Sequence, residues 1–242
     1  MALPKIDVPI FELTLPLSKQ SIRFRPFLVR EEKILLMAME SDDEMSNMLA
    51  IKQIITNCVL DDIDLNMMAV VDMEYLFLNL RARSVGEISD VHYKCNNTVT
   101  DEKGEHECGT IVKTSFNLLE IEPVFNPDHS NKIALSPSLG IAMKYPTVGM
   151  MYNTKVSSID GIMDVLISCI DYIYDEESIY YAKDSTQEEL SDFVESLTKE
   201  QFVKLQDFFI LMPKLTKKLE FKCDKCGYTD EISLEGIQSF FE

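Results

Sequence analysis

The sequence is poor in basic residues and in histidine. Its 242 residues include 23 Lys and Arg against 41 Asp and Glu, which gives a formal net charge of −18. A molecule with a field of this sign repels polyphosphates, so general nucleic-acid binding is disfavoured. Only 3 histidines occur, and none is paired with a plausible nucleophile. The sequence therefore offers few candidate residues for general-base catalysis.

Several signals of other protein classes are also missing. No apolar run reaches the roughly 18 residues of a membrane span, and the N-terminus lacks the basic and apolar regions of a signal peptide. The chain has no Walker loop, no Gly-x-Ser-x-Gly elbow and no dinucleotide fingerprint. We therefore expect a soluble intracellular protein that is not an enzyme and has no small-molecule substrate.

Four of the six cysteines occur in two similar segments. In both segments an apolar and basic run leads into a first cysteine, and the second cysteine is followed by glycine. Four thiolates close the tetrahedral shell of Zn²⁺ and leave no position for water or substrate. The pattern predicts a structural zinc ion whose ligands are Cys95, Cys108, Cys223 and Cys226.

Other interpretations of the cysteines remain open. The first pair is separated by 12 residues, so this insert must loop out if its sulfurs are to converge. Four free thiols, or a redox pair at 223–226, are the alternatives to zinc, although a redox pair normally opens a helix. His106 could replace a cysteine as ligand. Cys58 and Cys169 fall on apolar helix faces, where we expect them in the core.

The N-terminal half shows strand, then helix, then strand patterns. Period-two alternation predicts a β-hairpin over residues 10–25, and the helix signals that follow predict three helices, near 30–40, 45–59 and 72–83. Alternation returns from Gly86 to Phe116, which indicates a second hairpin with a long polar tip.

The C-terminal half begins with an irregular, partly stranded connector over residues 122–149. A helix is predicted from about Ser157 to Tyr174, and two capping boxes, Ser185–Glu188 and Thr198–Gln201, predict two further helices. The remaining predicted elements are strands at 219–222 and 229–233 and a short helix at 234–241.

These elements predict an α+β fold with an N-terminal β-hairpin, a helical body and a zinc-ribbon-like β module formed from two distant hairpins. We divide the chain into an N-terminal hairpin with helices, the first half of the module, a stranded connector with a helical insert, and the second half of the module with a C-terminal helix. The corresponding residues are 1–85, 86–118, 119–215 and 216–242.

A local basic patch lies around the second cysteine pair. Five lysines fall between Pro213 and Cys226, where they could meet an acidic partner or offset the negative charge of the thiolates. This patch motivates an alternative function, a zinc-ribbon nucleic-acid-binding or transcription factor. A metal-dependent hydrolase is a third possibility, but it would require an open coordination position.

Two stretches, Arg25–Ser41 and Leu197–Leu215, together with the Cys-x-x-Cys-Gly segment and Gly236–Phe241, carry a family resemblance. The chain resembles the baseplate hub assembly proteins of T-even-type contractile-tailed bacteriophages, which are myoviruses. This resemblance implies a structural or chaperone-like role in viral tail assembly, with other phage baseplate hub proteins as partners. It also implies a location in the host cytoplasm during assembly, with the virion tail baseplate as the alternative location.

Overall fold

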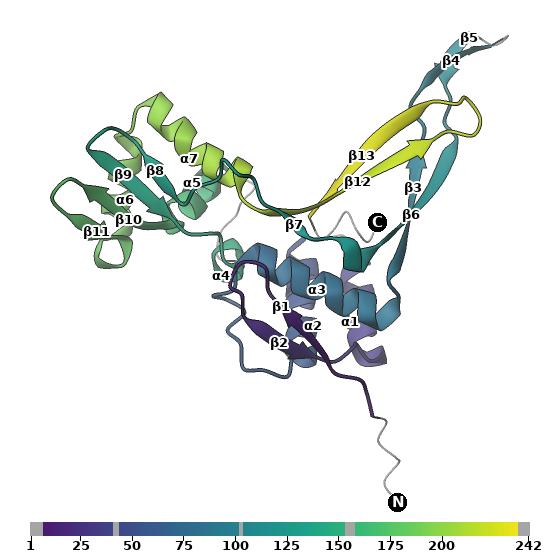
Figure 1. The fold of residues 1–242 in the computed structure, drawn as a ribbon, viewed down its shortest axis with the longest axis horizontal. Coiled ribbons are helices and arrows are strands. Elements are labelled where there is room, and N and C mark those ends of the chain that lie inside the picture. Colours follow the sequence, from purple (N-terminus) through teal and green to yellow (C-terminus); the bar gives the residue numbers. More distant parts are fainter. Residues whose placement is uncertain (1–6, 41–43, 102–103, 153–157, 237–242) are drawn as a thin grey trace, which may run out of the picture. The chain divides into compact units, whose positions relative to one another are not determined.

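The computed structural model describes residues 7–40, 44–101, 104–152 and 158–236. Helices and several antiparallel sheets make the fold α+β, as predicted (Figure 1). The chain forms two compact units, and each unit is built from separate stretches of sequence. Unit 1 comprises Met1–Asp61, Glu74–Val124 and Lys214–Glu242, and unit 2 comprises Asp62–Met73 and Phe125–Pro213. The four-segment division made from the sequence stays a prediction.

Unit 1 begins with the predicted hairpin and helices. Strands β1 (Phe11–Thr14) and β2 (Ser21–Phe24) pair antiparallel, and alternation along β2 buries Ile22 and Phe24. Helices α1 (Val29–Met39), α2 (Glu44–Cys58) and α3 (Val70–Val85) follow. The apolar face of α3 is fully buried, with Met73, Leu76, Phe77 and Leu80 in the core, and the division between the units falls within this helix, after Met73.

A buried carboxylate fixes the start of α1. The side chain of Glu31 is fully buried and accepts hydrogen bonds from Arg25 Nη2 at 3.1 Å, Arg30 Nε at 2.6 Å and the Leu28 N–H at 2.8 Å. Burial alone would raise the pKa of this carboxyl, but these hydrogen bonds outweigh it and lower the pKa to about 2. The first turn of α1 is thereby tied to Arg25, just beyond strand β2.

Two hairpins that are distant in sequence complete unit 1. Strand β3 (Ile88–Lys94) pairs with β6 (Ile111–Asn117), and β12 (Lys214–Lys222) pairs with β13 (Thr229–Glu235) and, at its start, with β7 (Pro123–Val124). Leu78 and Ala82 of α3 share a buried cluster with residues of β6, the following 3-10 turn Leu118–Glu120 and β12. Nearer the ends of the hairpins, the ring centroids of Tyr93 and Phe221 lie 4.2 Å apart.

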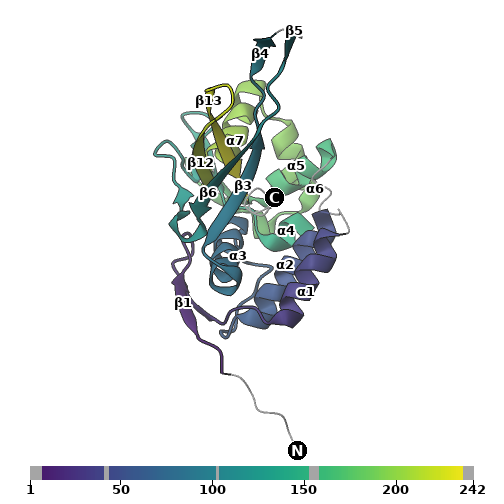
Figure 2. The ribbon, with the colours of Figure 1, turned by 90° about the vertical axis from the view of Figure 1, so that its right-hand side faces the viewer.

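The polar insert of the first hairpin is itself a small hairpin. Strands β4 (Thr98–Asp101) and β5 (Gly104–Glu107) pair antiparallel, and we call them the tip hairpin. In both overall views the tip hairpin extends beyond β12 and β13 and away from helices α1–α3 of the same unit (Figure 1, Figure 2).

Unit 2 packs helices against an antiparallel sheet. The sheet has the order β11-β10-β9-β8, with strands Ile179–Tyr181, Ile170–Asp175, Leu139–Met143 and Lys132–Ala134 respectively. The helices are α4 (Val148–Tyr152), α5 (Ile159–Ser168), α6 (Gln187–Glu195) and α7 (Lys199–Leu211), with a 3-10 turn at Ala182–Asp184. The core between sheet and helices includes Ile141, Leu166, Ile173, Val194, Leu205 and Phe208.

Three predicted elements differ from the structure. The helix expected to reach Tyr174 ends at Ser168, because Ile170–Asp175 instead pairs with β9 as strand β10. The first capping box is Thr186–Glu189, one residue later than predicted. Of the predicted C-terminal helix, residues 234 and 235 belong to β13, and residues 237–241 lie outside the described part of the chain.

Candidate metal centre

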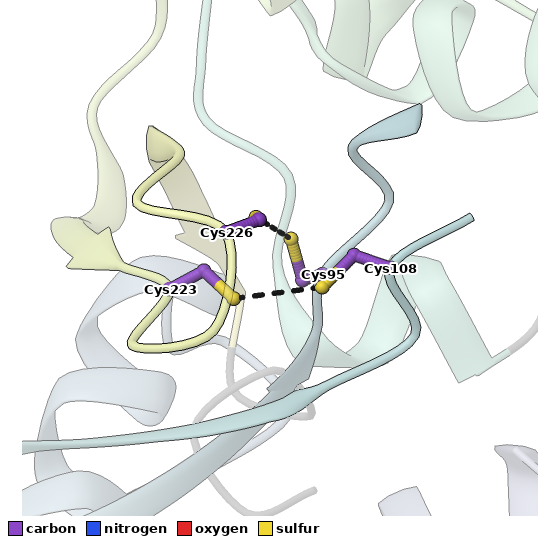
Figure 3. Close-up of side chains that lie close together, drawn as sticks. All are labelled: Cys95, Cys108, Cys223 and Cys226. Carbon is purple, nitrogen blue, oxygen red and sulfur yellow. Dashed lines mark hydrogen bonds between the residues drawn. The ribbon is translucent and has the colours of Figure 1, made fainter. Parts of the chain in front are cut away.

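The structure brings the four predicted cysteines together from the two distant hairpins of unit 1 (Figure 3). Their sulfur atoms all lie within 4.8 Å of one another, with Cys95 Sγ 3.7 Å from Cys226 Sγ and Cys108 Sγ 3.8 Å from Cys223 Sγ. A tetrahedral Zn²⁺ with Zn–S bonds of about 2.3 Å needs neighbouring sulfurs about 3.8 Å apart. The donor atoms therefore fit a tetrathiolate zinc site.

Cys95 and Cys108 form the first half-site. The Cys95 N–H donates to the Thr110 carbonyl at 2.8 Å, and the Gly109 N–H donates to the Cys95 carbonyl at 3.0 Å. These two hydrogen bonds close the chain into a loop that presents both sulfurs on one side. Gly109 has a φ of 65°, a conformation that glycine adopts at little cost.

Cys223 and Cys226 form the second half-site, which repeats these backbone contacts. The Cys223 N–H donates to the Tyr228 carbonyl at 2.8 Å, and the Gly227 N–H donates to the Cys223 carbonyl at 2.8 Å. Gly227 has a φ of 72°. In both half-sites the N–H of the first cysteine donates to the carbonyl of the residue two positions after the second cysteine. The two loops are therefore equivalent in their hydrogen bonding despite their different lengths.

The wide spacing of the first half-site does not keep its sulfurs apart. The tip hairpin runs out and back between the two cysteines, and the Cys108 N–H donates to the Asn97 carbonyl at 2.8 Å. This bond brings the ends of the insert together, as the tight turn of residues 224 and 225 does in the second half-site. The insert is thus compatible with a metal site, although only the cysteine spacing was visible in the sequence.

The surroundings of the sulfurs combine burial with a few polar contacts. Cys95, Cys108 and Cys223 are buried, and Cys226 is half-buried. The Thr110 hydroxyl lies 3.3 Å from Cys108 Sγ and is the main cause of a lowered pKa for that thiol. Although a backbone hydrogen bond at Asn97 favours the thiolate of Cys95, burial and the neighbouring sulfurs raise its pKa. Thiols this close compete for ionisation, and a shared divalent cation would relieve that competition.

Sequence reasoning missed the polar contacts around the sulfurs. The Asn97 amide Nδ2 lies 3.6 Å from Cys226 Sγ, so a residue of the first half-site approaches the more exposed sulfur of the second. Val99, Val112 and Tyr228 pack around the cluster and limit access of water. The only sequence signal for these residues is their position two to four residues from a cysteine.

The other candidate residues lie elsewhere. His106 is exposed on β5, and its Nδ1 is 3.2 Å from the Gly104 carbonyl oxygen. Cys58 and Cys169 are fully buried, and burial raises the pKa of each thiol, to about 11 and about 12 respectively. A metal ion could be shared by three or more Cys, His, Asp or Glu side chains that lie close together. Within the described ranges, the four cysteines form such a group, and no other is found.

The lysines near the second half-site have acidic partners. Lys214, Lys217 and Lys218 of β12 form ion pairs with Glu235, Glu120 and Glu231 at 2.8, 3.8 and 2.8 Å. The basic patch seen in the sequence is therefore largely compensated along this strand.

In the described part of the chain, no helix is long and apolar enough to cross a membrane.

Comparisons with known proteins point in one direction. A family model described as T4 bacteriophage base plate protein matches residues 8–242. The baseplate hub assembly protein gp26 of Enterobacteria phage T4 is 26% identical over 193 residues, which cover 79% of this chain and 80% of that protein. No solved structure is significantly similar to the chain.

Proposed function

The chain belongs to the T4 bacteriophage base plate protein family, and from this premise we propose that it is a non-enzymatic factor in the assembly of the phage baseplate hub. The observation that carries the proposal is the match to a baseplate hub assembly protein along four fifths of the length of both chains. Other baseplate hub proteins are its partners in this proposal. It acts in the host cytoplasm during assembly, and its retention in the virion tail baseplate is an experimental question.

The proposal includes one structural zinc ion held by the four cysteines. When bound, the ion supplies a crosslink between the two half-sites and no open coordination position. Metal binding to such sites contributes on the order of 10 kcal/mol to the folding of a small module. Here the crosslink would join the ends of the β3–β6 and β12–β13 hairpins, which are otherwise held by side-chain packing such as the Tyr93–Phe221 contact.

The metal site also bears on how unit 2 is held in the chain. The chain leaves unit 1 after Val124 and returns at Lys214, and these two residues pair with each other between β7 and β12. A crosslink at the far end of β12 would stabilise the sheet that holds these two of the four connections between the units. We propose that helices α5 and α7 of unit 2 contact other hub proteins, because Ile162 on α5 and Val203 and Ile210 on α7 are exposed.

Two measurements test the proposed function. Elemental analysis of freshly purified protein should find about one zinc ion per chain, and a result with no stoichiometric transition metal would remove the zinc from the proposal. Affinity purification from phage-infected cells should recover baseplate hub proteins. If it recovers none, the assembly role fails. A parallel assay for the polypeptide in purified virions distinguishes a hub component from a factor that leaves the particle.

The nucleic-acid-binding alternative has little support from the charges. Three of the five lysines that motivated it are ion-paired with glutamates, and the chain has a net charge of −18. Retention on DNA or RNA at physiological ionic strength, falling steeply with added salt, would revive this alternative.

A further inference from the structure

The insert between Cys95 and Cys108 is larger than a metal site of this kind needs. The second half-site makes the same backbone hydrogen bonds with only residues 224 and 225 between its cysteines. The first half-site has 12 residues in that place. Because the loop geometry is equivalent in both, the additional residues are not explained by the positions of the sulfurs.

The tip hairpin formed by this insert is exposed and pairs only with itself. All four residues of β5 are exposed, as are Thr98 and Thr100 of β4. Among the described strands, β4 and β5 form a sheet of two with no third member. Isolated two-stranded hairpins are marginally stable in water, so the packing of Val99 against the cysteine cluster anchors this one.

The two edges of the tip hairpin differ in how well they are protected. Strand β5 has Glu105 and Glu107, and charged side chains discourage strand pairing along an edge. Strand β4 has the β-branched residues Thr98, Val99 and Thr100 and lacks a charge until Asp101. The β4 edge is therefore the one suited to accept another strand.

The hydrogen-bond pattern identifies the groups that face the β4 edge. The Cys108 N–H donates to the Asn97 carbonyl, so in this antiparallel ladder residues 97, 99 and 101 direct their backbone groups toward β5. The N–H and C=O groups of Thr98 and Thr100 consequently point outward. They have no strand partner among the described residues.

The charge of the insert indicates the kind of strand that would fit. Residues 96–107 include Asp101, Glu102, Glu105 and Glu107 against Lys103, a net charge of −3 with His106 neutral. Because electrostatic complementarity guides docking, a strand bordered by Lys or Arg is favoured over an acidic one. A second copy of the tip hairpin has the same negative charge and is disfavoured for the same reason.

We propose that the tip hairpin is a docking element that adds an edge strand of another baseplate hub protein to β4, with Lys or Arg side chains of that partner reaching across β4 toward Glu105 and Glu107. This inference rests on the proposed assembly function and specifies the kind of partner surface. The cysteine centre has a defined part in it, because it fixes the base of the hairpin from which β4 projects.

A shortened chain separates docking from folding. Replacing residues 96–107 with Asp-Lys copies the spacing of the second half-site into the first. The variant should keep the zinc content of the wild type, with a lower thermal midpoint because Asn97 and Val99 no longer contact the cysteine cluster, but lose capture of at least one purified hub protein that the wild type captures. It should also fail to restore plaque formation to a phage in which this gene is disrupted.

A proline substitution tests the edge itself. Thr100→Pro removes an N–H that the tip hairpin does not use internally, so the hairpin should form while strand addition at β4 is blocked. Thr100→Val is the matched control and should bind hub proteins as the wild type does. Charge reversal by Glu105→Lys with Glu107→Lys should weaken capture at low salt more than at high salt.

The outcomes distinguish this inference from the proposed function. If the wild type captures hub proteins and both the shortened and Thr100→Pro variants capture them equally well, the docking role of the tip hairpin is wrong and the assembly role stands. If the wild type captures no hub protein, both fail. Capture that is lost in Thr100→Pro and retained in Thr100→Val supports docking through the β4 edge.

Discussion

Gly109 and Gly227 occupy equivalent positions in two hairpins that are far apart in the sequence. Each follows the second cysteine of its half-site, has a positive φ and donates its N–H to the carbonyl of the first cysteine. Their shared conformation explains how a loop of twelve residues and a loop of two can present sulfur atoms in the same way.

Substitution of Gly227 tests the importance of this conformation. No heavy atom lies within 4 Å of the position that a Cβ would occupy, so Gly227→Ala meets no steric obstacle and bears only the backbone penalty of a positive φ. We expect the free energy of unfolding to fall by roughly 1–2 kcal/mol. The free energy of unfolding should fall by less in Gly227→Asn, because asparagine tolerates a positive φ better than alanine does. Urea unfolding of the three proteins, in buffer with zinc, measures both differences.

The metal site predicts a contrast among the cysteine variants. Cys226→Ser removes one thiolate of the four and should lower both the bound zinc and the thermal midpoint. Cys169→Ala alters a cysteine buried in unit 2, far in sequence from the cluster, and should keep full zinc content. Elemental analysis and differential scanning calorimetry make the comparison. Equal zinc content in both variants would contradict the proposed ligand set.

The buried carboxylate of Glu31 predicts a pH dependence of stability. Its pKa falls from 4.5 to about 2 on folding, which corresponds to about 3 kcal/mol. Because the folded-state pKa is lowered, this stabilisation is fully present above pH 4.5 and is lost as the pH falls toward 2. Glu31→Gln should therefore be less stable than the wild type at pH 7, with a smaller difference near pH 3. Urea titrations at the two pH values measure the change, and a pH-independent difference would contradict the ionised carboxylate.

A close contact in unit 2 predicts a pair of coupled substitutions. The ring of Tyr174 covers Gly140, and a Cβ at this glycine would collide with the ring, including Cε1 at 2.8 Å. Gly140→Ala should lower the free energy of unfolding by about 1–3 kcal/mol, as overpacking does. In a Tyr174→Ser background the same substitution should cost much less. Four urea curves complete the cycle, and additive effects would show that the ring moves aside freely.

The capping residue of α6 can be tested against its neighbour. The Glu189 N–H donates to Thr186 Oγ1 at 3.2 Å, and the Glu189 carboxylate accepts from the Thr186 N–H at 2.7 Å. Thr186→Ala should lower the free energy of unfolding by about 1 kcal/mol. Ser185→Ala, one residue earlier, should change it by much less. A larger loss of unfolding free energy for Ser185→Ala than for Thr186→Ala would indicate that Ser185, the residue predicted from the sequence, caps α6.

The sequence was most informative where local chemistry decides the structure. The N-terminal hairpin, the three helices of the first half and the strands around both cysteine pairs follow from alternation, helix periodicity and glycine positions. The convergence of the four cysteines was also predictable, since both half-sites share one local pattern. The metal itself stays a prediction.

Other features depend on contacts that no local pattern specifies. Ile170 and Ile173 continue the apolar spacing of α5, so they suit a helix and a buried strand equally well, and the pairing of Ile173 with Ile141 decides for the strand. The tip hairpin was expected only as a loop, because residues 96–107 lack an aliphatic pattern. The contact of Asn97 with Cys226 requires both half-sites to be in place.

The order in which the cysteines occur has a consequence for biosynthesis. Because Cys223 and Cys226 both follow the second segment of unit 2, a nascent polypeptide emerging from the ribosome presents only Cys95 and Cys108 of the four thiols until Phe125–Pro213 has been translated. Unit 2 can therefore begin to fold before the metal centre can close. Closure of the tetrathiolate would then mark the stage at which unit 1 acquires its last two strands.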